Sequence, residues 1–303
     1  MLKDPARLLL YLAGIVLLGA LAAPPLFWFA QALAGHGVLS GLARYDFETY
    51  FHRALLIAAI VLLWPLLRVL HVCNWRDLGL AKNPRPATDT LAGFLIAAVP
   101  LLCCGAVLVA LHVYSLRSSF LWSKMPAVLA ATFAVPVVEE ILFRGLILGV
   151  LLRGFSRLAA LLLTSALFSI IHFLKAPEAT TPNDSVRWFS GFVSVAHSFG
   201  QFRDPWLLLA GFLTLFIIGC ILADARLATR SLWLPIGLHA GWIFGNGLFS
   251  KAAHRALLAL PWLGKDLLVG IVPLIVALAS WALVRGWLRY AETRAPESLS
   301  RTR

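Results

Sequence analysis

Eight apolar stretches divide this 303-residue chain, each close to the length that a helix needs to cross a bilayer. The hydrocarbon core of a membrane takes about 20 apolar residues per helix. Hydrophobic residues make up 60% of the chain and charged residues only 13%, whereas soluble domains are roughly half apolar and a quarter charged. We therefore predict an all-α fold, a polytopic integral membrane helical bundle with about eight transmembrane helices. The predicted segments are 8–33, 54–72, 91–114, 126–151, 158–174, 206–223, 231–249 and 267–285.

The first segment allows two interpretations. Lys3 and Arg7 precede an apolar stretch that ends at Ala20-Leu-Ala22-Ala, which resembles a signal-peptide cleavage site. Seven further apolar segments favour an uncleaved signal anchor instead, because the first helix can then stay in the membrane as the first of several crossings. Pro24 and Pro25 predict a break in the helix of this segment, since proline lacks the backbone N–H that a helix interior uses.

The basic residues predict the orientation of the chain. If the N-terminus is cytoplasmic and all eight segments cross, more of the 26 Lys and Arg residues fall inside than outside. Both termini are therefore expected in the cytoplasm, with the protein in the plasma membrane. The net charge of +12 does not indicate nucleic acid, because no basic cluster alternates with aromatic residues. The expected partners are the lipid bilayer and a membrane-embedded or lipidated substrate, with no nucleic acid.

Two adjacent glutamates, Glu139 and Glu140, lie inside the fourth apolar segment. Ionisable residues at such a depth are costly and usually functional. Arg144 follows Glu140 by four residues, the favourable spacing for an ion pair on one helix face. Glu139 points about 100° away from Glu140, so it is suited to accept a proton from water as a general base. The plainer alternative is an ion-paired packing motif without chemistry.

Two histidines lie in later segments. Phe168 and His172 are four residues apart and share a helix face. His239 lies well inside the seventh segment, and Asn246 shares its face two turns along. Counted from the predicted cytoplasmic ends, Glu139, His172 and His239 fall near the middle of the bilayer. One Glu and two His from three helices can activate water directly, or ligate a divalent metal such as zinc (Zn) with an open position.

Other features of the apolar segments predict packing rather than chemistry. Gly237, Gly241 and Gly245 repeat every fourth residue, a pattern that lets a neighbouring helix approach closely. The four cysteines have neither disulfide-framework nor zinc-knuckle spacing and are expected to be small buried residues.

Three motifs, in order and on separate apolar segments, resemble the signatures of the CPBP family. These are CAAX-processing and bacteriocin-processing (Abi) intramembrane endopeptidases, related to the Ras-converting prenyl-protein protease. Each motif alone is weak, but the ordered set is specific, and the resemblance covers about residues 126–247. The motifs are Glu139-Glu140-x-x-x-Arg144, Phe168-x-x-x-His172, and His239 in a Ser-Leu-Trp-x-Pro-Ile-x-x-His-Ala context.

The resemblance implies a role for each motif. Glu139 would activate water together with His172, and His239 would stabilise the tetrahedral oxyanion. Glu140 and Arg144 would support this geometry. One position departs from the family pattern, because Ile243 stands where the family usually has Asn or Asp. Either Asn246 substitutes, or the oxyanion site relies on His239 and backbone, and the loss of one such donor typically lowers the rate by about 10²–10³.

The resemblance also divides the chain into three expected parts. Residues 1–125 hold N-terminal transmembrane helices without a signature, 126–250 form the protease-like core, and 251–303 hold the last transmembrane helix and a basic cytoplasmic tail. The long connection 175–205 carries an aromatic stretch at 186–202, which predicts an interfacial helix or a re-entrant cover.

Three functions remain open from the sequence. The favoured one is an intramembrane endopeptidase that hydrolyses a peptide bond of a membrane-associated or lipidated protein with a glutamate-activated water. The second is a weakly active or inactive homologue that binds a membrane partner or acts as an immunity factor, as Ile243 suggests. The third is a proton-coupled transporter, since buried Glu and His also form proton relays. Metal dependence and the identity of the substrate are left open.

Overall fold

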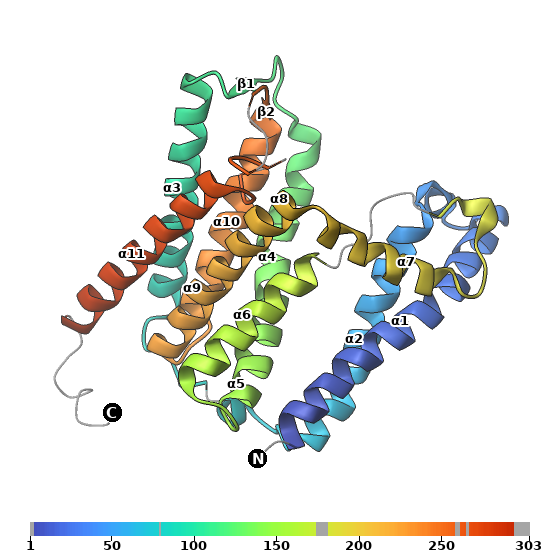
Figure 1. Ribbon diagram of the computed structural model, residues 1–303, viewed down its shortest axis with the longest axis horizontal. Coiled ribbons are helices and arrows are strands. Elements are labelled where there is room, and N and C mark those ends of the chain that lie inside the picture. The colour runs from blue at the N-terminus through green and yellow to red at the C-terminus, as the bar shows by residue number, and fades with distance from the viewer. Residues whose placement is uncertain (1–2, 79, 174–180, 258–260, 265–266, 294–303) are drawn as a thin grey trace. The chain divides into compact units, whose positions relative to one another are not determined.

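Helices account for all eight predicted segments in the computed structural model, which describes residues 3–78, 80–173, 181–257, 261–264 and 267–293 (Figure 1). The predicted all-α membrane fold is confirmed. The long helices are α1 (Lys3–Gly35), α2 (Phe47–Val69), α3 (Pro86–Ala110), α4 (Met125–Glu140), α6 (Arg157–Phe173), α9 (Leu213–Thr229), α10 (Trp233–Ala252) and α11 (Ile271–Thr293). The shorter elements are α5 (Leu148–Leu151), α7 (Ser190–Ser198), α8 (Pro205–Leu207), β1 (Tyr114–Leu116) and β2 (Ala253–Arg255).

Length and composition alone identify fewer candidate membrane spans than the eight predicted segments. Among the described residues, five helical stretches are long and apolar enough to cross a membrane: Lys3–Gly35, Phe47–Val69, Pro86–Ala110, Leu208–Thr229 and Ile271–Ala291. The other three predicted segments fall short for different reasons. The fourth is divided by a π-helix, α6 is a shorter apolar helix, and α10 carries polar residues along its length.

The chain forms two compact units. The first comprises Met1–Asp77 and Ile170–Asp204, and the second comprises Leu78–Ser169 and Pro205–Arg303. The three-part division drawn from the motifs stays a prediction.

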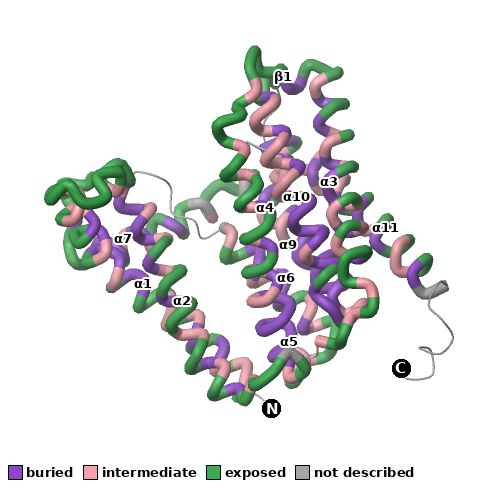
Figure 2. The backbone as a smooth tube through the Cα atoms, turned by 180° about the vertical axis from the view of Figure 1, so that it is seen from behind, coloured by how far each residue is buried: buried purple, intermediate pink, exposed green. Residues whose placement is uncertain are grey.

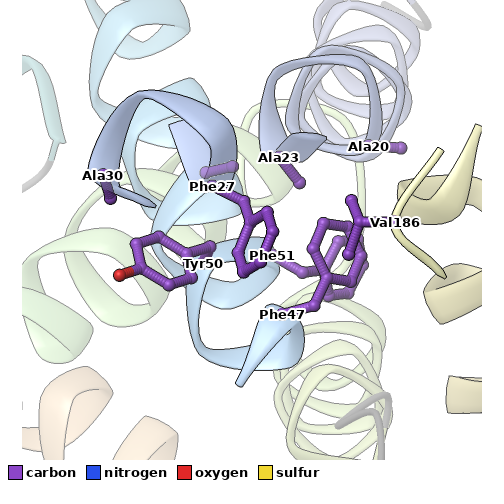
Figure 3. Close-up of a cluster of buried hydrophobic side chains, with 9 residues drawn as sticks. Ala20, Ala23, Phe27, Ala30, Phe47, Tyr50, Phe51 and Val186 are labelled. Atoms are coloured by element: carbon purple, nitrogen blue, oxygen red, sulfur yellow. The ribbon is translucent and has the colours of Figure 1, made fainter. Parts of the chain in front are cut away.

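In the first unit, small residues of α1 and aromatic rings of both helices form the contact between α1 and α2 (Figure 3). Phe27 of α1 meets Phe47 and Tyr50 of α2 edge-on, with ring centroids 5.8 and 5.4 Å apart. This edge-to-face arrangement is the favoured geometry for aromatic pairs. Alanines at 20, 23 and 30 on α1 leave room for these rings. Asp46 begins α2, because its side chain accepts a hydrogen bond from the Thr49 N–H (3.1 Å).

The predicted break at Pro24 and Pro25 is wrong, because α1 continues through both prolines to Gly35. Pro24 has no N–H to offer the Ala20 carbonyl four residues earlier. Helix α7 covers that carbonyl: a Cβ on Gly191 would clash with the Ala20 oxygen, so the approach requires glycine. A neighbouring helix that covers freed backbone groups lets a proline persist in a membrane helix. The predicted helix within 186–202 therefore exists as α7, and its interfacial position stays a prediction.

In the second unit, the glycine stripe of α10 packs against α3, as predicted. A Cβ on Gly237 would clash with the Thr90 carbonyl oxygen, and one on Gly241 with the Phe94 carbonyl oxygen. Gly93 of α3 makes the reciprocal close contact with α10: a Cβ on Gly93 would lie 2.6 Å from the Leu234 carbonyl oxygen. The strands β1 and β2 pair antiparallel just beyond these helices and join their ends. Close backbone approach is thus the reason for the stripe.

Burial in the second unit centres on α9 and α10 (Figure 2). Every residue of α9 from Ile218 to Arg226 is buried. On α10, the buried positions include both the glycine stripe and His239. The middle of the unit is therefore enclosed on several sides, whereas much of α4 remains exposed along one face.

We expect Gly241→Ala to lower the thermal unfolding midpoint of the protein in detergent. The added methyl group would clash with the Phe94 oxygen and lie 2.8 Å from Ala97 Cβ. Overpacking of this kind costs typically about 1–3 kcal/mol. Gly286→Ala in α11 is the matched control, because a Cβ there has nothing within 4 Å. Equal unfolding midpoints for the two variants would contradict the close α3–α10 contact.

Candidate functional site

The glutamate pair lies where α4 changes its helical geometry. Glu140 is the last residue of α4, and the π-helix Ile141–Ile147 follows it directly. Such segments are rare and often mark functional sites. The wider turn places Arg144 inside the π-helix, and all residues from Phe143 to Ile147 are buried. Both charged residues therefore sit in the enclosed part of the second unit.

Glu140 and Arg144 form the predicted ion pair. Arg144 Nη1 donates to Glu140 Oε1 at 2.9 Å, and both side chains are fully buried. A buried pair depends on good geometry and on further hydrogen bonds, because both charges have left water. Arg144 gains one of these bonds at the Gly219 carbonyl oxygen of α9, 3.4 Å from Nη2. The ion pair is thus anchored between two helices.

Aromatic rings cover the Arg144 guanidinium. Its Cζ lies 4.4 Å from the ring centroid of Phe168 on α6 and 5.7 Å from that of Phe143. The two rings meet edge-on, with centroids 5.1 Å apart. A cation over an aromatic face is stabilised, more so away from water. Phe168 therefore contacts the site directly, whereas the contributions of Phe143 and Gly219 have no signal in the sequence pattern.

His239 reaches the same carboxylate from α10. Its Nδ1 lies 2.8 Å from Glu140 Oε1, the oxygen that also accepts from Arg144. Because an ionised carboxylate only accepts hydrogen bonds, Nδ1 carries a hydrogen and donates it to Glu140. The ring orientation is then set, and Nε2 faces Glu139 Oε2 at 3.8 Å. The Phe168 ring also packs edge-on against the His239 ring, with the two ring centroids 6.1 Å apart.

The glycine stripe explains why His239 points this way. The three glycines of α10 span about 80° of the helix circumference, and His239 lies about 160° from their centre. Since the glycines pack on α3, His239 is directed to the opposite side of α10, towards Glu140. The sequence predicts the glycine stripe and the buried histidine as separate features. The packing of α10 shows that the position of the stripe determines the direction of His239.

Glu139 differs from its neighbour in exposure. Its side chain is 25% exposed, whereas that of Glu140 is fully buried and that of His239 is 8% exposed. A separation of 3.8 Å between Glu139 Oε2 and His239 Nε2 is too long for a direct hydrogen bond. One water molecule can lie about 2.8 Å from both atoms. The arrangement is therefore suited to binding and polarising a water molecule.

The remaining predicted residues lie as follows. His172 is half-buried in the last turn of α6, four residues after Phe168 and so on the same helix face. Asn246 lies about 10 Å of helix rise beyond His239, and its Oδ1 accepts a hydrogen bond from the Leu267 N–H (3.1 Å). Ile243 is half-buried on the same helix. The catalytic roles of His172 and Asn246 stay predictions.

A zinc site also stays a prediction. Among the residues that the structure describes, no three His, Cys, Asp or Glu side chains gather as a group that could hold a metal ion. Glu139 Oε2 and His239 Nε2 are two donors that face one another. A catalytic zinc takes three protein ligands and a water. The predicted set of Glu139, His172 and His239 would have that number and those donor types.

Comparison with known proteins agrees with the motifs. Residues 120–245 match the family described as "Type II CAAX prenyl endopeptidase Rce1-like". No curated protein and no solved structure matches the chain. The matched range begins just before α4 and ends within α10. It therefore contains Glu139, Glu140, Arg144, Phe168, His172 and His239.

Proposed function

From the membership of residues 120–245 in the Type II CAAX prenyl endopeptidase Rce1-like family, we propose that this chain is an intramembrane endopeptidase with a glutamate-activated water. Its substrate is a membrane-associated or lipidated protein or peptide. The observation that carries the proposal is the set of contacts in which Glu140, bound by Arg144, holds His239 opposite Glu139. We assign the chemistry to Glu139, the glutamate nearer to solvent.

Glu139 acts as the general base in this mechanism. It accepts a proton from the water that lies between it and His239, and the water oxygen attacks the carbonyl carbon of the scissile peptide bond. The carbonyl electron pair moves to oxygen and forms the tetrahedral oxyanion. When that intermediate collapses, the carbon–nitrogen bond breaks and the proton held by Glu139 passes to the leaving amine. Glu139 returns to its ionised state.

His239 stabilises the oxyanion, and Glu140 makes this possible. With Nδ1–H held by Glu140, a protonated imidazole presents Nε2–H towards the reacting oxygen. A buried carboxylate that accepts from Nδ1–H orients the ring and stabilises the imidazolium. Arg144 prevents Glu140 from turning away, because it holds the same carboxylate oxygen at 2.9 Å. His172 assists Glu139 in water activation, as the family resemblance implies.

The surface beside Glu139 suits a substrate that arrives through the membrane. Phe133, Val137 and Val138 of α4 are 72%, 42% and 57% exposed. Exposed apolar residues of this kind are expected to face lipid or another apolar chain. A peptide held at the bilayer by a lipid group or by its own apolar segment would therefore contact α4 within two turns of Glu139.

We expect His239→Ala to lower the cleavage rate by about 10²–10³, the usual effect of losing one oxyanion donor. The measurement is cleavage of membrane-anchored peptides by the purified full chain, with metal content determined on the same samples. Stoichiometric zinc that disappears in His239→Ala together with activity would assign a metalloprotease. Cleavage by a metal-free wild type that is abolished by Glu139→Gln would assign water activation to Glu139. His254→Ala, in the exposed part of β2, is the matched control.

The departure at Ile243 favours a second candidate function. The chain lacks the family's Asn or Asp at that position, and the Asn246 side chain is engaged with Leu267. An inactive homologue would bind a membrane peptide or partner without cleaving it. If this is correct, cells that carry Glu139→Gln keep the wild-type phenotype. For a protease, they show the phenotype of cells that lack the gene.

A further inference from the structure

We propose that the second unit binds the phosphate group of an anionic phospholipid between the start of α6 and the end of α9, through the exposed Arg157 and Arg230, with the buried Arg226 adding positive charge. This inference does not depend on protease activity. It starts from the packing of α6 against α9. Gly219 lies against Ser165, since a Cβ on it would be 3.0 Å from Ser165 Cα, and Ser169 Oγ donates to the Phe212 carbonyl oxygen at 2.8 Å.

These two contacts establish an antiparallel register. From Ser165 to Ser169 the chain of α6 runs forward by four residues, whereas their contacts run backward from Gly219 in α9 to Phe212, the residue just before α9. In the other direction, Arg157 lies about 12 Å from the level of Ser165, and Arg226 about 10 Å from the level of Gly219. The arginines of both helices therefore meet at one end of the unit, where Figure 1 shows α6 beginning and α9 ending.

Their charges repel one another. Arg226 is only 3% exposed, and both Arg157 and Arg230 act on it electrostatically. Arg226 Nη2 donates to the Leu78 carbonyl oxygen at 2.9 Å, which holds this guanidinium in place. Within the described part of the chain, neither Arg157 nor Arg230 has an acidic ion-pair partner. Asp224, on the same helix, is engaged with Arg285 and Trp281.

The start of α6 adds to the positive charge. Ser156 caps the helix by accepting from the Ala159 N–H at 3.3 Å, and Arg157 follows it at once. The N-terminal end of a helix carries a partial positive charge and favours acidic side chains. The first turn of α6 holds an arginine and no acidic residue. An arginine there is unfavourable unless an anion is bound, and helix N-termini bind phosphate groups readily.

The membrane supplies the anion. Basic pockets between transmembrane helices on the cytoplasmic side are suited to anionic headgroups, and the predicted topology places all three arginines on that side. Arg157 and Arg230 are exposed and can reach a headgroup phosphate, while Arg226 contributes charge from within the unit. An arginine guanidinium matches phosphate oxygens with two parallel hydrogen bonds.

The test uses the full chain in nanodiscs of phosphatidylcholine with an increasing fraction of phosphatidylglycerol. Retained lipids are identified by native mass spectrometry. We expect wild type to retain phosphatidylglycerol preferentially, and Arg157→Gln/Arg230→Gln to lose about thirtyfold in apparent affinity, since each arginine contributes roughly a factor of five near an anionic surface. Arg157→Lys/Arg230→Lys should recover part of the loss, which distinguishes lost charge from misfolding.

The matched control is Arg117→Gln/Lys124→Gln. It removes the same charge from two exposed residues near the other end of the unit, close to β1 and the start of α4. Unchanged lipid retention in this control supports the site. Equal retention by the Arg157/Arg230 variant and by this control would overturn it. A rise in unfolding temperature with inorganic phosphate, without preference for phosphatidylglycerol, would overturn the lipid as the ligand.

Discussion

Replacing Glu139 with Gln is expected to lower the rate of peptide cleavage by about 10²–10⁴, the usual contribution of a general base. The amide has nearly the same shape as the carboxylate but cannot accept a proton from water. Glu139 is 25% exposed and lies 3.8 Å from His239, so the change should leave the fold and the Glu140–Arg144 pair intact. Cleavage of membrane-anchored peptides tests the loss of activity. The thermal unfolding midpoint, measured on the same preparation, tests whether the fold is intact.

Glu48→Gln is the matched control for that experiment. Glu48 is a buried glutamate of α2, and it accepts a hydrogen bond from the Thr181 N–H at 2.9 Å. Glutamine can accept the same bond through its carbonyl oxygen. Cleavage should therefore persist in the control and disappear in Glu139→Gln. Full activity of Glu139→Gln would show that another group activates the water and would refute the mechanism.

The helices could be predicted from the sequence because each apolar segment carries its own evidence. A run of bilayer length must satisfy its backbone internally, so it is helical whatever its neighbours are. The count of crossings could not be predicted in the same way. α10 is lined by glycines that contact α3 and carries His239 on its opposite side, so it is enclosed by protein and does not need a uniformly apolar surface.

The site could be predicted only where its contacts are local. The Glu140–Arg144 pair follows from a spacing of four residues on one helix. The contact between Glu140 and His239 joins residues 99 positions apart, and helical periodicity does not report which of two adjacent glutamates a distant histidine meets. The π-helix after Glu140 also changes the angular position of the residues that follow it. The division of roles between the two glutamates therefore required the tertiary structure.

Replacing Arg144 with Met is expected to lower the free energy of unfolding by about 3–5 kcal/mol, the cost of leaving a buried charge without its partner. Glu140 would keep only the His239 contact in a fully buried position. Methionine has a similar length and removes the charge, so the change tests electrostatics more than volume. The thermal unfolding midpoint of the purified protein and its expression level are the measurements.

The ion pair Arg285–Asp224 is the control that shows whether the stability loss in Arg144→Met comes from burial or from the loss of any ion pair. Its distance of 2.8 Å is as short as that of the Arg144 pair, but the Arg285 side chain is 54% exposed. Asp224 is buried, but it also accepts a hydrogen bond from Trp281 Nε1 at 2.9 Å and would keep that bond. Water reaches its exposed partner, so Arg285→Met should shift the unfolding midpoint less than Arg144→Met does. The double variant Arg144→Met/Glu140→Gln should regain part of the lost stability, because no buried carboxylate then remains uncompensated. Equal effects of Arg144→Met and Arg285→Met would mean that water reaches Glu140, and the separation of roles between Glu139 and Glu140 would then lose its physical basis.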